Sequence, residues 1–180
     1  MVYSSLSDPE HVRCMRLALD EASKCEPTST AFCVGCVITA PSSDGSYSTI
    51  AMGYSRELEG NTHAEQIALT KLASTSTYSS GLPPSTRLYT TMEPCSLRLS
   101  GNLPCVDRIL QTSIRQIYVA VLEPDDFVQD VQGVQKLLNA GRQVVVVEDP
   151  GLKEECLRVA RRGHLSNGAA APDALVSAAK

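Results

Sequence analysis

Apolar residues repeat at helical spacing in the first part of the chain. From Val12 to Ala22 they recur every three or four positions, directly after Ser7-Asp8-Pro9-Glu10, which has the capping side chain, early proline and acid of a helix start. We therefore predict a helix over residues 9–24. Similar patterns predict further helices over residues 63–74, 104–111, 128–140 and 153–162.

Short runs of apolar and β-branched residues lie between these helices. The run from Phe32 to Thr39 is typical of a buried strand, and Ser48 to Tyr54 completes a hairpin after the Asp44-Gly45 turn. Further strands are predicted over residues 87–91, 115–121 and 143–147. A helix separates the last two strands, so these should be parallel and joined by a right-handed crossover. The order predicts an α/β fold: a three-layer α/β/α sandwich around a five-stranded mixed sheet.

Composition narrows the class of protein. The 180 residues suit one domain, over residues 1–167, followed by an alanine-rich tail over residues 168–180 that composition predicts to be disordered. A net charge of −4 argues against nucleic acid as a partner, and no apolar run approaches the roughly 20 residues of a membrane span. We find no secretory signal, and seven cysteines, an odd number, indicate reduced thiols and metal ligands. We therefore expect a cytoplasmic or nuclear protein.

Two segments carry the candidate chemistry. His63-Ala64-Glu65 opens the second helix, and Pro94-Cys95 is followed ten residues after Cys95 by Cys105. A histidine and two thiolates leave the fourth position of a tetrahedral zinc open, as in catalytic zinc sites. Glu65 would then be the proton carrier that a zinc-activated water needs. Helix positions i and i+2 point to nearly opposite sides, so we expect the metal beyond the helix's N-terminal end.

Two other interpretations use the same residues. His63 and Glu65 could be surface residues, and Cys95 and Cys105 ordinary core thiols. Alternatively, Cys33 and Cys36 could form one half of a four-cysteine zinc ribbon, with Cys95 and Cys105 as the other half. Geometry disfavours the ribbon, because strand residues three apart lie about 10 Å apart and face opposite ways. Cys33 and Cys36 are better interpreted as small buried residues.

The chain resembles the cytidine-deaminase-like superfamily. Within it, the long loop between the cysteines is similar to the riboflavin-biosynthesis pyrimidine deaminases, and residues 53–58 and 98–102 resemble the fungal form. Ala31-Phe32 stand where the bacterial relatives have Asn-Pro, and Arg56 stands where they have His. The resemblance therefore does not imply that this chain acts on the same substrate as the bacterial enzymes. The superfamily resemblance rests on Val34-Gly35-Cys36-Val37-Ile38, His63-Ala64-Glu65, Thr91-Met92-Glu93-Pro94-Cys95-Ser96 and Pro104-Cys105.

The resemblance implies a function and a set of roles. The fungal deaminase converts 2,5-diamino-6-ribitylamino-4(3H)-pyrimidinone 5′-phosphate to 5-amino-6-ribitylamino-2,4-pyrimidinedione 5′-phosphate and ammonia. His63, Cys95 and Cys105 would hold zinc and Glu65 would carry the proton; a homodimer is expected on the same ground. Polar residues on loops beside the ligands are candidates for holding the ribityl phosphate: Arg56, Asn61, Arg98 and Asn102.

Two alternative functions stay open from the sequence. One is a deaminase of another nucleobase or of tRNA adenosine, which the long loop between Cys95 and Cys105 disfavours. The other is a zinc-binding interaction module without catalysis, which would leave Glu65 without a role.

Overall fold

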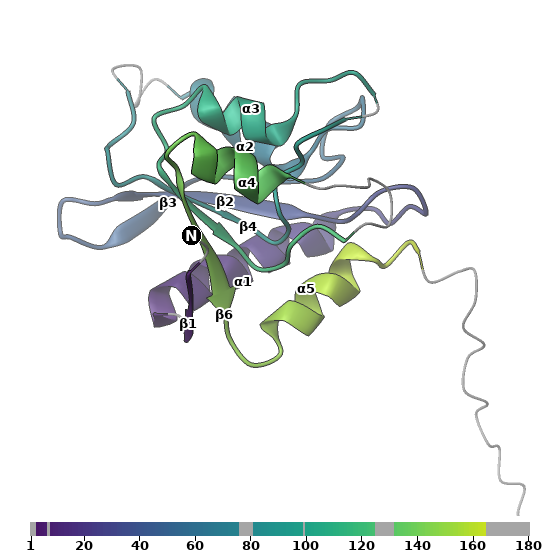
Figure 1. Cartoon of the computed structure of the whole chain (residues 1–180), viewed down its shortest axis with the longest axis horizontal. Helices are drawn as coiled ribbons and strands as arrows, with labels where there is room; N and C mark the ends of the chain where they lie inside the picture. The colour runs from purple at the N-terminus through teal and green to yellow at the C-terminus, as the bar shows by residue number, and fades with distance from the viewer. Residues whose placement is uncertain (1–2, 7, 76–80, 99, 125–131, 165–180) are drawn as a thin grey trace, which may run out of the picture.

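The computed structural model describes residues 3–6, 8–75, 81–98, 100–124 and 132–164. In this part of the chain a six-stranded sheet lies between two layers of helices (Figure 1). The strands are β1 (Tyr3–Leu6), β2 (Gly35–Pro41), β3 (Tyr47–Tyr54), β4 (Arg87–Thr90), β5 (Gln116–Val119) and β6 (Gln143–Glu148). The helices are α1 (Pro9–Lys24), α2 (Ala64–Ala73), α3 (Cys105–Leu110), α4 (Gly133–Asn139) and α5 (Leu152–Ala160).

The sheet is mixed, with one strand opposed to the others. The strand order is β1-β6-β5-β4-β2-β3. The pairs β1–β6, β6–β5 and β5–β4 are parallel, whereas β2 is antiparallel to both of its neighbours, β3 and β4. The ends of β3, β4 and β5 and the beginning of β2 therefore meet at one edge of the sheet.

Alternate residues of the central strands fill two separate cores. On one face α1 and α5 cover a cluster that includes Val37, Tyr89 and Val147. On the other face α2, α3 and α4 cover a cluster that includes Ile38 and Leu88 (Figure 1). Successive strand residues point to opposite faces, so neighbours such as Val37 and Ile38 separate into different layers.

The predicted architecture is confirmed, with one addition. All five predicted strands and all five predicted helices are present, and β5 and β6 are parallel as expected. The sheet has a sixth strand, β1, that the sequence pattern did not predict. The helix predicted over residues 128–140 begins at Gly133 in the structure, and residues 125–131 lie outside the described residues. The tail over residues 168–180 also lies outside them.

The helices are too short or too polar for a bilayer. No helix in the described ranges has the length and apolar character that crossing a membrane requires.

Candidate zinc centre and pocket

His63 occupies the position just before the first turn of α2. Its backbone is extended (φ −98°, ψ 156°), and the helix begins at the next residue, Ala64. The preceding loop is closed by the Arg56 amide, which donates to the carbonyl of Thr62 at 2.7 Å. The Thr62 hydroxyl donates to the Leu58 carbonyl at 3.0 Å, which closes the loop a second time. This loop holds the imidazole at the N-terminal end of α2, where the spacing of His63 and Glu65 had placed the metal.

The two cysteines reach the same point from different elements. Cys95 lies in the loop after β4, and Cys105 is the first residue of α3 after Pro104. The backbone amide of Cys105 donates to Cys95 Sγ at 3.4 Å, and the amide of Val106 donates to the Cys95 carbonyl at 3.2 Å. A hydrogen bond from the Cys105 thiol outweighs burial and lowers the pKa of Cys95 to about 4. Cys95 is therefore predisposed to be a thiolate, the form that ligates metals.

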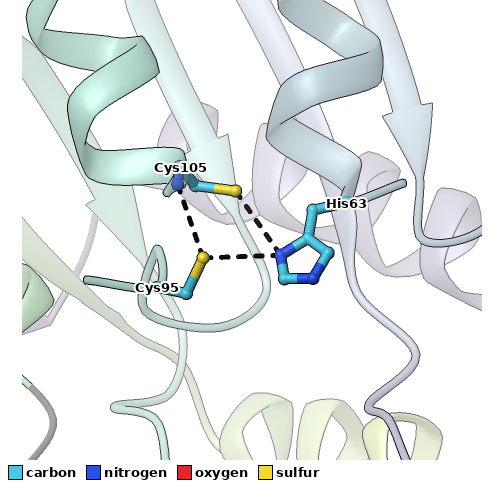
Figure 2. A group of neighbouring side chains, drawn as sticks. All are labelled: His63, Cys95 and Cys105. Atoms are coloured by element: carbon cyan, nitrogen blue, oxygen red, sulfur yellow. Dashed lines mark hydrogen bonds between the residues drawn. The ribbon is translucent and has the colours of Figure 1, made fainter. Parts of the chain in front are cut away.

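The three side chains converge with the spacing of a zinc site (Figure 2). His63 Nδ1 lies 3.5 Å from Cys95 Sγ and 3.5 Å from Cys105 Sγ, and all three ligand atoms lie within 4.8 Å of one another. Zinc bonds of about 2.05 Å to nitrogen and 2.3 Å to sulfur, at the tetrahedral angle, place those atoms about 3.6 Å apart. The donor set and its geometry therefore fit zinc. Among the described residues, this is the one group of histidine, cysteine and acidic side chains close enough to share a metal.

Glu65 supplies a carboxylate that is separate from the three ligands. It lies in the first turn of α2, is 3% exposed, and lines the same pocket as His63 and Cys95. Burial, followed by the negative charge of Cys95, raises its pKa above the ordinary value. The Thr90 hydroxyl lies 3.0 Å from its Oε1 atom. The pocket is thus lined by two of the three nitrogen and sulfur donors and by a buried acid, with Cys105 buried behind them, as a hydrolytic zinc site requires.

The predicted substrate-binding residues differ in their placement. Arg56, Asn61 and Arg98 line the pocket, whereas the described pocket lining includes Ser100 but not Asn102, which is exposed nearby on the same loop. Ala31 and Phe32, where the chain differs from the bacterial relatives that have Asn-Pro, also line the pocket.

Both arginines of this set are bound to the pocket wall. Arg56 donates to the carbonyls of Phe32 at 3.0 Å and Glu26 at 2.8 Å, and its Nη2 lies 2.8 Å from Cys25 Sγ. Arg98 donates to Gln66 Oε1 at 3.0 Å and to the carbonyl of Asn61. These bonds fix the positions of both positive charges before any ligand arrives.

Two acids of the site were not predicted. Glu123 lines the pocket, and burial raises its pKa to about 8. Glu93 also lines the pocket, and its Oε1 accepts from the Val134 amide at 2.7 Å while its Oε2 accepts from the Glu123 amide at 3.3 Å. The sequence offered one signal for Glu123, which follows shortly after β5, a strand parallel to β4. The carboxyl ends of parallel strands share one edge of a sheet, so a residue at this position lies near the end of β4.

The fold and the site together define a class of zinc-binding deaminase domains. The family described as "Cytidine and deoxycytidylate deaminase zinc-binding region" matches residues 8–121, and the chain belongs to this family. Its sequence is 43% identical over 157 residues to diaminohydroxyphosphoribosylamino-pyrimidine deaminase of Schizosaccharomyces pombe, covering 86% of this chain and 36% of that protein. It is 34% identical over 106 residues to riboflavin biosynthesis protein RibD of Aquifex aeolicus, covering 59% of this chain and 26% of that protein.

Solved structures give the same relationship. Rib2 deaminase of Aspergillus oryzae, a C-terminal deletion mutant, is 36% identical with a TM-score of 0.74, covering 86% of this chain and 92% of that chain. The same deaminase in complex with DARIPP has a TM-score of 0.75. The present chain spans about a third of the length of the S. pombe protein, 36%, and less of the bacterial ones.

Proposed function

We propose that the protein is a zinc-dependent hydrolytic deaminase of riboflavin biosynthesis. It converts 2,5-diamino-6-ribitylamino-4(3H)-pyrimidinone 5′-phosphate to 5-amino-6-ribitylamino-2,4-pyrimidinedione 5′-phosphate and ammonia. The observation that carries this proposal is the buried Glu65, which lines one pocket with His63 and Cys95 beside the group formed by His63, Cys95 and Cys105. The resemblance to the S. pombe and A. oryzae deaminases supports the substrate class.

The chain's own residues would divide the work in the following way. Zinc held by His63, Cys95 and Cys105 supplies a Lewis acid that makes water nucleophilic near neutral pH. Glu65 takes a proton from the water that attacks C2 of the pyrimidine ring and delivers it to the neighbouring ring nitrogen. It then takes the proton of the new C2 hydroxyl group and gives it to the amine, so that the C2–N bond breaks, the hydroxyl becomes a carbonyl, and ammonia leaves as a neutral molecule. The buried position of Glu65 keeps bulk water from competing for that proton.

The phosphorylated side chain of the substrate requires hydrogen-bond donors at the rim. We propose that Arg56, Asn61, Arg98 and Asn102 form this part of the site. Arg56 and Arg98 supply fixed positive charge in the pocket wall, and Asn61 and Asn102 supply exposed amides on the loops beside it. Charge placed in advance favours an anionic ligand without the entropy loss of ordering long side chains on binding.

The proposal extends to assembly and location. We propose a homodimer of a single deaminase domain over residues 1–167 that carries the tail over residues 168–180. We also propose that it works in the cytoplasm or the nucleus. All seven cysteines are free thiols, which agrees with a reducing compartment.

A substrate panel tests the proposal. Ammonia release is measured with the ribitylamino and ribosylamino phosphates side by side, and with cytosine, guanine and an adenosine-containing tRNA, while zinc content is measured on the same protein. We expect release from the ribitylamino phosphate above all others. Preference for the ribosylamino phosphate would correct the substrate, and release from a nucleobase or tRNA alone would replace the proposal.

X-ray absorption at the zinc edge separates an enzyme from a zinc-binding interaction module. We expect three protein ligands and one light-atom ligand from water. Four protein ligands, with no ammonia released from any compound in the panel, would establish the non-catalytic module instead.

A further inference from the structure

Thr90 places a hydroxyl in an apolar layer of the protein. It is the last residue of β4, is completely buried, and lies on the same face of the sheet as Leu88. Its neighbours in register are Cys36 on β2 and Val119 on β5, and both belong to the apolar cluster beneath α2 and α3. Valine has nearly the same shape and suits a strand equally well. The hydroxyl therefore needs an explanation beyond packing.

The hydroxyl lies near two acceptor oxygens of different kinds, and its single proton is donated to one of them at a time. Thr90 Oγ1 lies 3.0 Å from the carbonyl oxygen of Met92 and 3.0 Å from Glu65 Oε1. The Met92 carbonyl belongs to the backbone immediately after β4, where the next amide, that of Glu93, donates to the Val121 carbonyl at 2.8 Å. One partner is thus fixed backbone, and the other is the end of a side chain in the pocket.

A glutamate carboxylate needs such a contact to keep one orientation. The last torsion of glutamate joins an sp³ carbon to an sp² carbon, so its preferred angles are broad. The carboxylate also interacts with its own backbone amide and with the Cys105 thiol, but a thiol is a weak donor and a zinc-bound thiolate has no proton to donate. The Thr90 hydroxyl is a stronger donor held in place by β4, and an ionised carboxylate accepts its proton in preference to the neutral Met92 carbonyl.

We propose that Thr90 is a positioning residue that sets the orientation of the Glu65 carboxylate. The hydroxyl holds Oε1, and this leaves Oε2 as the oxygen that exchanges protons in the pocket. A carboxylate that rotates freely would spend most of its time misaligned for proton transfer, although the substrate would still bind. This inference rests on the proposed function, in which Glu65 carries the proton.

Two substitutions at this position separate the hydroxyl from the shape of the side chain. Thr90→Val keeps the shape and removes the hydroxyl, whereas Thr90→Ser keeps the hydroxyl and removes a methyl group. For Thr90→Val we expect kcat to fall by roughly tenfold to a hundredfold, as for loss of a hydrogen bond to a charged group, with KM within about twofold. Thr90→Ser should restore kcat to within about threefold of wild type. Both variants should bind zinc at the wild-type ratio.

Other results would overturn the inference. These are an unchanged kcat in Thr90→Val, a change confined to KM, a Thr90→Ser variant as slow as Thr90→Val, or loss of zinc from Thr90→Val. The last result would show that Thr90 supports the fold of the metal site instead.

Crystal structures of the zinc-loaded proteins give a readout that does not need activity. Wild type should show one orientation of the Glu65 carboxylate, and Thr90→Val should show a rotated or divided one. An identical carboxylate in both structures overturns the inference. If wild type releases no ammonia from phosphorylated pyrimidines, the proposed function fails, while this comparison still tests the positioning role of Thr90.

Discussion

Glu65 is two residues from His63, and the helix end explains how both serve one pocket. His63 precedes the first turn in an extended conformation, whereas Glu65 already has the conformation of a helix. The change of backbone between them turns the imidazole and the carboxylate toward the same space, which two residues at this spacing inside a helix could not reach. Substitution of Glu65 should therefore remove proton transfer without removing metal binding by His63.

Replacing Glu65 by glutamine tests this separation. Glu65→Gln keeps the size of the side chain and an oxygen for the Thr90 hydroxyl, but an amide cannot carry a proton between water and substrate. We expect zinc content to stay at the wild-type ratio and kcat to fall by at least about 10²–10⁴. The measurements are metal analysis and ammonia release on the same preparation. The exposed Glu59→Gln serves as a matched control, and normal turnover by Glu65→Gln would remove Glu65 from the mechanism.

His11 gives a pH-dependent contribution to stability far along the chain from the zinc ligands. Its Nδ1 lies 2.9 Å from the hydroxyl of Tyr89, and burial raises the pKa of that hydroxyl, so Tyr89 keeps its proton and donates it. Burial, followed by the charge of Arg87, lowers the pKa of His11 below its ordinary value, and the opposing charges of Asp8 and Glu10 offset this only in part. The folded protein therefore favours neutral His11.

The sign of the pH effect follows from this lowered pKa. Between the folded and unfolded pKa values of His11 the unfolded chain binds more protons, so stability rises with pH. We expect the free energy of unfolding of wild type relative to that of His11→Gln, from urea titrations, to decrease as the pH falls from about 7.5 to about 5.5. Groups common to both proteins cancel in this difference, among them Glu123, whose raised pKa has the opposite effect on stability. An equal slope in wild type and variant would show that His11 titrates alike in both states.

Single residues show how far sequence could predict the site. His63 and Glu65 are two residues apart and Cys95 and Cys105 are ten apart, so the residue types and spacing within these two segments indicated zinc chemistry directly. The direction of the Arg56 side chain could not be predicted, because its partners, the carbonyls of Phe32 and Glu26 and the thiol of Cys25, lie 24 to 31 positions away along the chain. Two of these partners are backbone groups, which leave no trace in residue type.

At the scale of elements, prediction succeeded where the pattern was local. The helix α1 begins and ends where its apolar repeat and its capping residue Asp8 indicated, at Pro9 and Lys24. The strand β1 was missed because Tyr3–Leu6 has only four residues and no alternation of apolar and polar positions. Its conformation depends on parallel pairing with β6, from Tyr3 with Val145 to Leu6 with Glu148. Such distant pairing is not encoded in a short window of sequence.

The contact between α1 and β2 depends on a glycine. A Cβ atom at Gly35 would lie 1.9 Å from the carbonyl oxygen of Ala18 and 2.4 Å from the amide nitrogen of Ala22. These are backbone atoms of α1, so the helix itself would have to move. We expect Gly35→Ala to lower the free energy of unfolding by at least about 2–3 kcal/mol, measured by urea denaturation.

A second glycine provides the control for this prediction. Gly45 has φ +84° and nothing within 4 Å of a built Cβ atom, so Gly45→Ala costs only the left-handed backbone strain of about 1 kcal/mol. Equal losses in the two variants would mean that the steric contact at Gly35 is relieved without cost.

At the scale of the molecule, the pocket forms where strand ends meet. Cys95 follows β4, Glu123 follows β5, Arg56 follows β3, and Phe32 precedes β2, so one edge of the sheet collects side chains from four separate segments. The metal ligands could be predicted from motifs, whereas Glu123 depended on knowing which strands are neighbours. Zinc bound by the three proposed ligands would join three of the surrounding elements: the start of α2, the loop after β4 and the start of α3.

Removal of zinc should therefore loosen this edge without unfolding the protein. The two large apolar clusters do not include His63, Cys95 or Cys105, so the sheet and its helices keep most of their packing. We expect a chelator to lower the melting temperature on the order of 10 °C while far-ultraviolet circular dichroism keeps its shape, since each kcal/mol lost corresponds to about 2–4 °C in a chain of this size.

Two cysteine variants decide whether this effect belongs to the proposed ligands. Cys95→Ser should bind little zinc and melt at the same temperature with and without chelator, because the linked binding energy is already lost. Cys36→Ala should keep both its zinc and its chelator response, since Cys36 lies in the cluster beneath α2 and outside the metal group. Loss of zinc from Cys36→Ala would restore the four-cysteine ribbon as the explanation. Complete unfolding of the chelator-treated wild type would instead show that the fold requires zinc. The open fourth coordination position of the zinc would then need an explanation other than catalysis.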